Sequence, residues 1–170
     1  MAVHQEIQKI LLARFGDKIH AVEETFGQSG ITVGREDLTA ILSFLRDEAQ
    51  LSFNFLMDLF GVDYMEMGGP ERFAVVYNLY SMPFGHRLRV RVYIPENDLH
   101  LPSVSALWPA ANWAEREVFD MFGITFDGHP NMTRILNPDD FSGFPLRKDF
   151  PVEGIGYREG FEKITRETAQ

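Results

Sequence analysis

Four charged side chains interrupt a run of large apolar residues between positions 114 and 125: Glu115, Arg116, Glu117 and Asp120. At ~100° per residue, a helix places both glutamates within its broad apolar face and groups Arg116 with Asp120 on the opposite side. A buried carboxylate is costly unless it is protonated or paired with a cation. Glu115 and Glu117 therefore each require a partner from elsewhere in the chain.

The segment from 126 to 151 supplies candidate partners for these carboxylates. Its cationic candidates are His129, Arg134, Arg147 and Lys148. His129 precedes Pro130, which favours a hydrogen-bonding role in holding a turn, and Asp149 follows Lys148, which favours an internal ion pair over acid catalysis. For Arg116 and Asp120 a mutual pair on a solvated face is an equally good interpretation, because such exposed pairs need no further partner.

A different chemistry is open to part of the same set. Glu115, Glu117, Asp120 and His129 offer carboxylate and imidazole ligands for a metal ion that activates water in hydrolysis. Such a site needs three or four ligands aimed at one point, whereas Glu115 and Glu117 point ~200° apart on a helix. A stand-alone metal-dependent hydrolase therefore remains the alternative from another functional class.

The element that positions these groups is a helix over 113–122. Asn112 is the predicted N-cap, Glu115 completes a capping box with it, and Gly123 is the left-handed residue that ends the helix. The predicted apolar face consists of Trp113, Ala114, Val118, Met121 and Phe122. This face must pack against the rest of a folded domain.

Periodicity upstream predicts that domain. Apolar residues at helical spacing indicate helices over 5–15 and from Asp37 onward, the second with Leu38, Ile41, Leu42 and Leu45 in one stripe. Strands are expected over 20–26, 31–33, the later part of 53–67, 72–81 and 87–94. Arg87, Arg89 and Arg91 alternate with apolar residues, which favours the solvent-facing side of a strand over a phosphate-binding ribbon.

These elements predict an α+β fold, with a small, mostly antiparallel sheet and helices packed on one side. Residues 1–126 form the expected α+β domain. Residues 127–170 form an extended C-terminal arm, because prolines and glycines punctuate the segment and prevent long helices or central strands. The arm keeps too much apolar mass for a solvated linker, so we expect it to bury side chains on the domain and on another subunit.

Composition excludes several functions. The formal net charge of −9 argues against nucleic acid as a partner, since phosphate binding needs a cationic surface. The chain has no cysteine, which excludes disulfides, a thiolate nucleophile and an ordinary cysteine-ligated iron–sulfur cluster. It has no glycine-rich nucleotide loop, no apolar run long enough to cross a bilayer and no signal-peptide pattern. We therefore expect a cytoplasmic location.

Short blocks of sequence resemble a known family. The blocks are Gly61-Val62-Asp63-Tyr64, Arg72 to Leu79, Glu115-Arg116-Glu117, Phe119 to Gly123, His129-Pro130, Arg134-Ile135-Leu136 and Pro145 to Pro151. In this order and spacing they resemble the 30 kDa subunit family of the proton-pumping NADH:quinone oxidoreductases, respiratory complex I.

The resemblance implies a non-redox scaffold subunit of the peripheral arm of that complex. It implies no catalytic, cofactor or metal site on this chain, with FMN and iron–sulfur clusters on partner subunits. The expected partners are the quinone-site (D) subunit and neighbouring cluster-carrying subunits, and the membrane is reached only through them, on its cytoplasmic side. The implied anchoring residues are Glu115, Arg116, Glu117, Asp120, His129, Arg134, Arg147, Lys148 and Asp149.

The electron donor stays open at this point. The same module occurs in relatives of complex I that use F420H2 or ferredoxin and in membrane-bound hydrogenase complexes. NADH is the default expectation, because it is the donor of the family that the blocks resemble.

Overall fold

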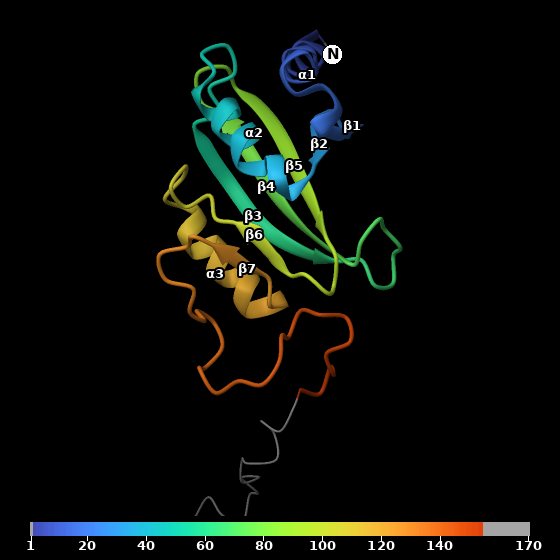
Figure 1. The fold of residues 1–170 in the computed structure, drawn as a ribbon, viewed down its shortest axis with the longest axis vertical. Helices are drawn as coiled ribbons and strands as arrows, with labels where there is room; N and C mark the ends of the chain where they lie inside the picture. The colour runs from blue at the N-terminus through green and yellow to red at the C-terminus, as the bar shows by residue number, and fades with distance from the viewer. Residues whose placement is uncertain (1, 155–170) are drawn as a thin grey trace, which may run out of the picture.

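The computed structural model describes residues 2–154 (Figure 1). Its helices are α1 (Ala2–Phe15), α2 (Arg35–Asp47) and α3 (Ala111–Phe122), and a 3-10 turn, Gly16–Lys18, follows α1. Its strands are β1 (Ile19–Thr25), β2 (Gln28–Val33), β3 (Phe55–Asp63), β4 (Phe73–Ser81), β5 (His86–Ile94), β6 (His100–Pro102) and β7 (Thr125–Asp127). None of the described helices is long and apolar enough to cross a membrane.

The main sheet has five strands in the order β1-β2-β5-β4-β3. Neighbouring strands are antiparallel except β2 and β5, which run parallel. The predicted α+β fold with a mostly antiparallel sheet is confirmed. The parallel pair was not predicted, because it joins strands separated by α2, β3 and β4 in the chain, and local periodicity carries no information about such pairing.

One face of the sheet carries the core. Alternate residues of β4 and β5 pair across this face, such as Val75 with Val92 and Tyr77 with Val90, and all four are fully buried. The apolar stripe of α2 belongs to the same core cluster, and so do Ile7 and Leu11 of α1. Helix α3 packs on this face as well. Phe122 of α3 lies against the Cβ position of Gly61, which pairs with Val75 of the core face. The predicted one-sided packing of helices is therefore confirmed.

The β1–β2 hairpin is longer than predicted. Its turn consists of Phe26 and Gly27, whose φ angles are 51° and 74°, and the residues from Gln28 on already pair with β1. The second strand therefore begins at Gln28, earlier than the predicted start at residue 31, because Gly30 is typical of a turn although it lies inside this strand. Positive φ at both turn residues matches the twist of a two-residue hairpin.

Strand β3 ends earlier than predicted, at Asp63 instead of near Met67. The carboxylate of Asp63 accepts the backbone N–H of Met65 at 2.9 Å, which turns the chain away from the sheet. Gly61, which seemed to break the strand pattern, continues the strand. A Cβ atom at this position would lie 2.6 Å from a ring carbon of Phe122, so the glycine allows α3 to approach the sheet.

A small second sheet frames α3. Strands β6 and β7 are parallel and pair Leu101 with Phe126, one strand before the helix and one after it. Neither strand was predicted, since three residues are too few to show a period. A helix that joins two parallel strands is a β-α-β crossover, which fixes both ends of α3.

Helix α3 begins two residues before the predicted start, and no side chain caps it, so the predicted capping box of Asn112 and Glu115 is wrong. Its C-terminus is as predicted: Gly123 has a φ of 76°, and its N–H donates to the carbonyl of Phe119. Val118, Met121 and Phe122 are buried as expected, whereas Trp113 is 62% exposed. The buried face of α3 is therefore rotated away from Trp113.

The arm follows β7 without regular secondary structure from residue 128 to residue 154, and it passes along one side of α3 and below its C-terminal end (Figure 1). Its aromatic residues Phe141, Phe144 and Phe150 are partly buried. Residues 155–170 of the predicted arm lie outside the described residues.

Candidate functional site: helix α3 and the arm

Asp120 is the point at which α3 holds the arm. The carboxylate is completely buried. Oδ1 accepts hydrogen bonds from Nη1 of Arg134 at 2.6 Å and from Nδ2 of Asn137 at 3.0 Å. Oδ2 accepts three backbone N–H groups, those of Ile135, Leu136 and Asn137, at 3.1, 2.8 and 2.8 Å. One carboxylate thus accepts the backbone N–H groups of three consecutive residues in an irregular turn.

These contacts keep Asp120 ionised. Burial alone would raise its pKa, but the N–H groups of Asn137 and Leu136 together with the guanidinium of Arg134 hold the pKa well below its ordinary value of 3.8. A buried carboxylate of this kind is stable only while every donor stays in place. Asp120 therefore makes the position of residues 134–137 depend on α3.

Arg134 closes the same turn from the arm side. Besides Asp120, its guanidinium donates to the backbone carbonyls of Phe141 and Gly143, each at 3.2 Å. It also lies over the rings of Phe141 and Phe144, with centroid distances of 5.9 and 5.4 Å. Arginine suits this position because its planar group presents several donors in a fixed geometry and stacks on aromatic rings.

Arg116 does not pair with Asp120, and that prediction is wrong. Its guanidinium donates to the carbonyls of Thr133 and Arg134 at 3.0 and 2.9 Å, and it lies 5.1 Å over the ring of Trp113. The two residues are one turn apart, but Asp120 faces inward and takes its cation from the arm. Arg116 therefore adds a second contact between α3 and the start of the same turn.

Glu115 is fully buried, as predicted from its place on the helix. Its Oε1 accepts the N–H of Val104 and its Oε2 accepts the hydroxyl of Ser103, both at 2.7 Å, whereas the imidazole of His129 is 3.9 Å away. Burial raises the pKa of Glu115, since desolvation outweighs these hydrogen bonds. Glu115 thus ties α3 to the segment that leaves β6, mainly through neutral donors.

The side chain of His129 is buried beside Glu115. Its Nδ1 accepts the N–H of Asn131, and its Nε2 lies 3.0 Å from the carbonyl of Asn112, to which it donates in the matching neutral tautomer. The imidazole therefore joins the turn around Pro130 to the first turn of α3.

Glu117 is exposed, so the prediction that it interrupts a buried surface is wrong. It lies one turn after Trp113, which is exposed too, and this side of α3 faces away from the sheet. The pattern of apolar residues predicts the wrong buried side of α3, because it includes Trp113, which is exposed.

A second cluster holds the distal part of the arm. Asp63, fully buried at the end of β3, accepts Nη2 of Arg72 at 3.1 Å and the backbone N–H of Lys148 at 2.9 Å. Arg72 also pairs with Asp149 at 2.7 Å and contacts Glu96. Burial opposes ionisation of Asp63, but the bonds from Arg72 and Lys148 lower its pKa below 3.8. The hydrogen bonds that Arg72 donates to Asp63 and Asp149 raise the pKa of Arg72.

Arg147 lies between the two clusters. Its Nε donates to the carbonyl of Phe122 at 2.7 Å, and its guanidinium stacks over the rings of Phe73 and Phe144 at 5.3 and 4.5 Å. Burial lowers its pKa. A Cβ atom on Gly123 would approach both Arg147 and Phe144 to 2.6 Å, so the arm packs directly on the end of α3.

The structure thus places Arg116, Asp120 and Arg134 in the first cluster, around Asp120, and Lys148 and Asp149 in the second, around Asp63. Arg147 lies between them, Glu115 and His129 hold the other side of α3, and Glu117 is exposed. Asp63, Arg72, Ser103 and Asn137 have roles that the sequence interpretation missed. Asp63 and Arg72 lie in blocks that carried the family resemblance, which was the available signal. Ser103 and Asn137 gave none, because short polar residues in irregular segments are common.

The metal-dependent hydrolase is not supported. Asp120 is engaged by the arm, Glu115 faces Ser103, and Glu117 is exposed, so the proposed ligands do not converge. Among residues 2–154, no group of three or more His, Cys, Asp or Glu could hold a metal ion.

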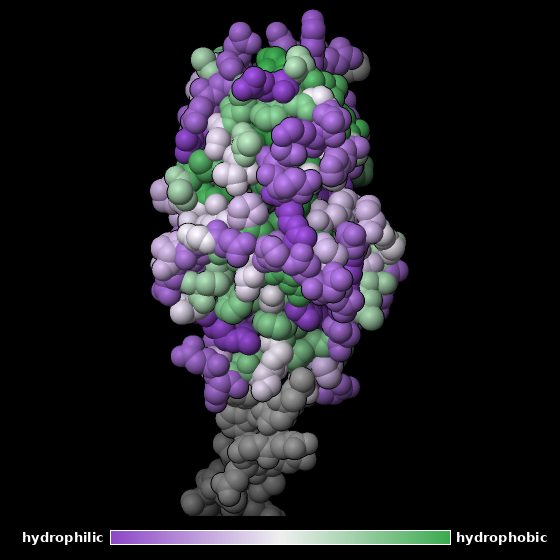
Figure 2. Space-filling view, viewed as in Figure 1, coloured by the Kyte–Doolittle hydropathy of each residue, from purple (hydrophilic) through white to green (hydrophobic). Residues whose placement is uncertain are grey.

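Several large apolar side chains of α3 and the arm are exposed. Trp113 of α3 is 62% exposed, and Leu136 and Leu146 of the arm are 65% and 52% exposed. The two leucines adjoin Asn137 and Arg147, which are hydrogen-bonded to α3. Figure 2 shows apolar residues mixed with polar ones over the lower part of the molecule, where Figure 1 places α3 and the arm. We use the name arm surface for four exposed residues, two on α3 (Trp113 and Glu117) and two on the arm (Leu136 and Leu146).

Comparison with known proteins agrees with this arrangement. Residues 31–155 match the family model described as "Respiratory-chain NADH dehydrogenase, 30 Kd subunit". The C subunit of the NADH-quinone oxidoreductase of Geobacter metallireducens is 45% identical over 146 residues, which cover 86% of this chain and 88% of the relative. The protein of the same name from Hyphomonas neptunium is 47% identical over 141 residues, which cover 83% of this chain and 68% of the relative.

Two solved structures have the same fold. A trypsin-resistant fragment (1–134) of Nqo5 has a TM-score of 0.66 and 39% identity, and the match covers 74% of this chain and 98% of the fragment. A chain of an archaeal membrane-bound sulfane sulfur reductase, described as a respiratory membrane complex, has a TM-score of 0.75 and 24% identity over 95% of this chain and 93% of its own. On these findings the chain belongs to the family of the 30 kDa subunit of respiratory-chain NADH dehydrogenase, which includes the two NADH-quinone oxidoreductase subunits compared above.

Proposed function

We infer that the chain is a non-redox scaffold subunit in the peripheral arm of a proton-translocating NADH:quinone oxidoreductase. It joins subunits of the complex and carries no catalytic step of its own. The observation that carries this proposal is the way Asp120 locks residues 134–137 onto α3, so that neighbouring apolar side chains face outward in a fixed position.

Fixing the arm matters because binding costs the entropy of ordering flexible segments. The bonds of Asp120 and of Asp63 order the arm within the chain itself. Trp113, Leu136 and Leu146 then present apolar area that loses no further backbone freedom when a partner covers it. Tryptophan is enriched among the residues that dominate interface binding energy, so Trp113 is the expected anchor, with Leu136 and Leu146 adding apolar area.

The proposed partners are the quinone-site subunit and the neighbouring cluster-carrying subunits. We expect FMN and the iron–sulfur clusters on partner subunits. For the clusters, the lack of any cysteine ligand in this chain supports this expectation. The chain reaches the membrane through these subunits, on the cytoplasmic side. NADH is the proposed donor, and F420H2, ferredoxin or a hydrogenase module is the alternative within the same class of complex.

Affinity purification of the tagged chain from mildly solubilised native membranes tests this proposal. We expect mass spectrometry to find a quinone-site subunit and cluster-carrying subunits in stoichiometric amounts, and the input module found with them identifies the electron donor. Recovery of the chain alone, from the soluble fraction, would contradict the scaffold function.

A further inference from the structure

The second face of the main sheet is not covered by α1, α2 or α3, all of which pack on the first. On this second face, β5 presents Arg87, Arg89 and Arg91, opposite to the buried Leu88, Val90 and Val92. Antiparallel sheets commonly expose one face to water, so exposure alone assigns no role to these arginines. The contacts of each arginine, described one by one, indicate a role.

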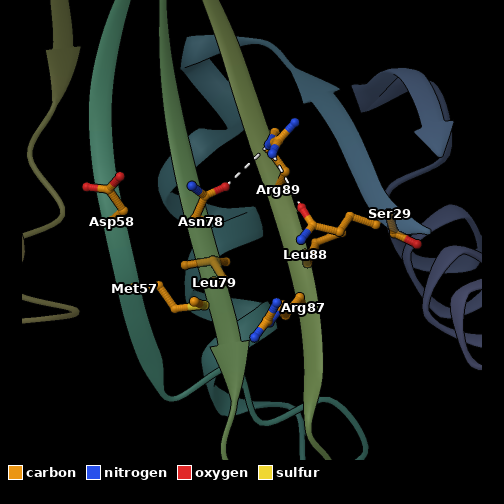
Figure 3. Close-up of a pocket in the computed structure, with 9 residues that line it drawn as sticks. Ser29, Met57, Asp58, Asn78, Leu79, Arg87, Leu88 and Arg89 are labelled. Atoms are coloured by element: carbon orange, nitrogen blue, oxygen red, sulfur yellow. Dashed lines mark hydrogen bonds between the residues drawn. The ribbon is translucent and has the colours of Figure 1, made fainter. Parts of the chain in front are cut away.

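Arg89 is held in place without being neutralised. Its Nε donates to Oδ1 of Asn78 on β4 at 3.3 Å, and its Nη2 donates to Oε1 of Gln28 on β2 at 3.4 Å (Figure 3). The two acceptors are neutral amides on the strands at either side. The guanidinium is thus oriented in advance, and it keeps its full charge and its remaining N–H donors for another group.

A cavity of about 330 Å³ opens beside this guanidinium. Met57, Asp58, Asn78, Arg87 and Arg89 line it, and in Figure 3 these side chains come from three adjacent strands. Asp58 contributes a carboxylate, but it accepts the N–H of Leu59 and forms no ion pair within the described residues. The cavity therefore carries two guanidinium groups against one carboxylate.

The lack of an ion pair distinguishes Arg87 and Arg89 from the next arginine on β5. Within residues 2–154, neither has a carboxylate within 4 Å, whereas Arg91 pairs with Glu23 at 3.1 Å. The chain has 25 acidic residues, but Asp58 is the one acidic residue among those lining this cavity, and it pairs with neither arginine. Within the described residues, the cavity therefore lacks an acidic group that pairs with Arg87 or Arg89.

The surroundings of the two arginines have the composition of a protein interface. Phe55 and Met57 of β3 are 49% and 46% exposed, and the ring of Tyr80 lies 6.0 Å from the guanidinium of Arg87. Aromatic residues, methionine and arginine are enriched in protein interfaces. We call Phe55, Met57, Tyr80, Arg87 and Arg89 the arginine face.

The arginine face lies on the opposite face of the sheet from α3, and its β4 residue lies far from the point where Arg147 of the arm contacts the domain. Phe73, where Arg147 of the arm stacks, and Tyr80 lie near opposite ends of β4, about 23 Å apart along the strand. A partner segment bound to α3 would have to pass to the other face of the sheet to meet Arg87. A contact at the arginine face has to come from a different segment.

We propose that the arginine face is a second subunit interface, where a partner protein places an aspartate or glutamate side chain between Arg87 and Arg89 and covers Phe55 and Met57. The proposal rests on the scaffold function, which it deepens: the chain connects two segments of the complex through opposite faces of one sheet. A charge-assisted bond to a guanidinium held by Asn78 and Gln28 gives this contact its direction.

Zero-length cross-linking in the assembled complex tests the proposal. Arg87→Lys and Arg89→Lys each introduce an amine, and a carbodiimide joins an amine only to a carboxylate in direct contact. Arg14→Lys, on the exposed side of α1, is the matched control. We expect a cross-link from position 87 or 89 to an Asp or Glu of another subunit, with at least about tenfold more product than from position 14.

Three results would count against it, and they are separable. If the variants purify with the complex but positions 87 and 89 give no more product than position 14, the second interface is refuted while the scaffold function stands. If an anionic lipid is found bound at these arginines in place of a carboxylate, the protein partner is refuted. If the unmodified chain does not purify with other subunits at all, the scaffold function itself fails.

Discussion

At the scale of single residues, Asp120 explains how an irregular segment acquires a fixed shape. Five hydrogen bonds converge on its carboxylate, all from residues 134–137. Bonds to a charged acceptor are stronger than those between neutral groups. Residues that cannot form a helix or a strand thus find their backbone partners in one side chain.

Asp120→Asn should lower the free energy of unfolding by about 3 kcal/mol, because Arg134 then keeps its charge at a partly buried site without a carboxylate. Urea denaturation followed by fluorescence measures the change. Asp139→Asn is the control, since Asp139 is an exposed aspartate on the same arm and should change little. Equal stability of the two variants would contradict the role given to Asp120.

The pH dependence of stability has a predictable sign. The folded pKa of Asp120 lies below the unfolded value of about 3.9, so its stabilisation is complete above about pH 4 and is lost as the pH falls further. Asp63 contributes in the same direction, and Glu115, whose pKa is raised, in the opposite one. We expect Asp120→Asn to lose less stability between pH 5 and pH 3 than the wild type, both followed by urea denaturation. Parallel curves would contradict this assignment.

At the scale of elements, the regular parts were predictable because their signal is local. The period-2 alternation of β5 and the apolar stripe of α2 follow from the sequence, and both elements lie close to their predicted positions. The orientation of α3 was not predictable in the same way. The apolar pattern predicts that Trp113 and Glu117 face the core. Contacts with β3 and the arm decide which side of α3 is buried, and the residues that make these contacts are distant in the sequence.

The end of α3 provides a test of the packing between helix and arm. Gly123→Ala places a methyl group against Arg147 and Phe144, in addition to the strain of a left-handed residue, which costs about 1 kcal/mol. Gly128→Ala has the same strain at a φ of 80° but meets no atom within 4 Å, so it is the control.

We expect Gly123→Ala to release the arm and Gly128→Ala to leave it in place. Limited proteolysis measures the difference as faster cleavage within residues 134–150. Similar cleavage rates in both variants would show that the arm does not depend on its contact with Gly123.

At the scale of the whole molecule, the chain presents two surfaces on opposite faces of the sheet, which suits a subunit that connects others. Family membership was predictable because ordered blocks such as Pro145 to Pro151 extend over a large part of the sequence. The structure gives a reason for these blocks, since this one holds Arg147, Lys148 and Asp149 against α3 and β3. Partner contacts were not predictable in detail, because half of each contact lies on another chain.

The central claim is that this chain supports assembly and takes no part in electron transfer. The most direct test measures both the amount of assembled complex and the NADH:quinone reductase activity per assembled complex. The variants are Leu136→Ala, Trp113→Ala and Glu117→Ala of the arm surface, and Leu12→Ala on α1 is the exposed control. We predict less assembled complex for the arm-surface variants, with unchanged activity in each complex that forms. Normal assembly with lower activity per complex would contradict the scaffold function.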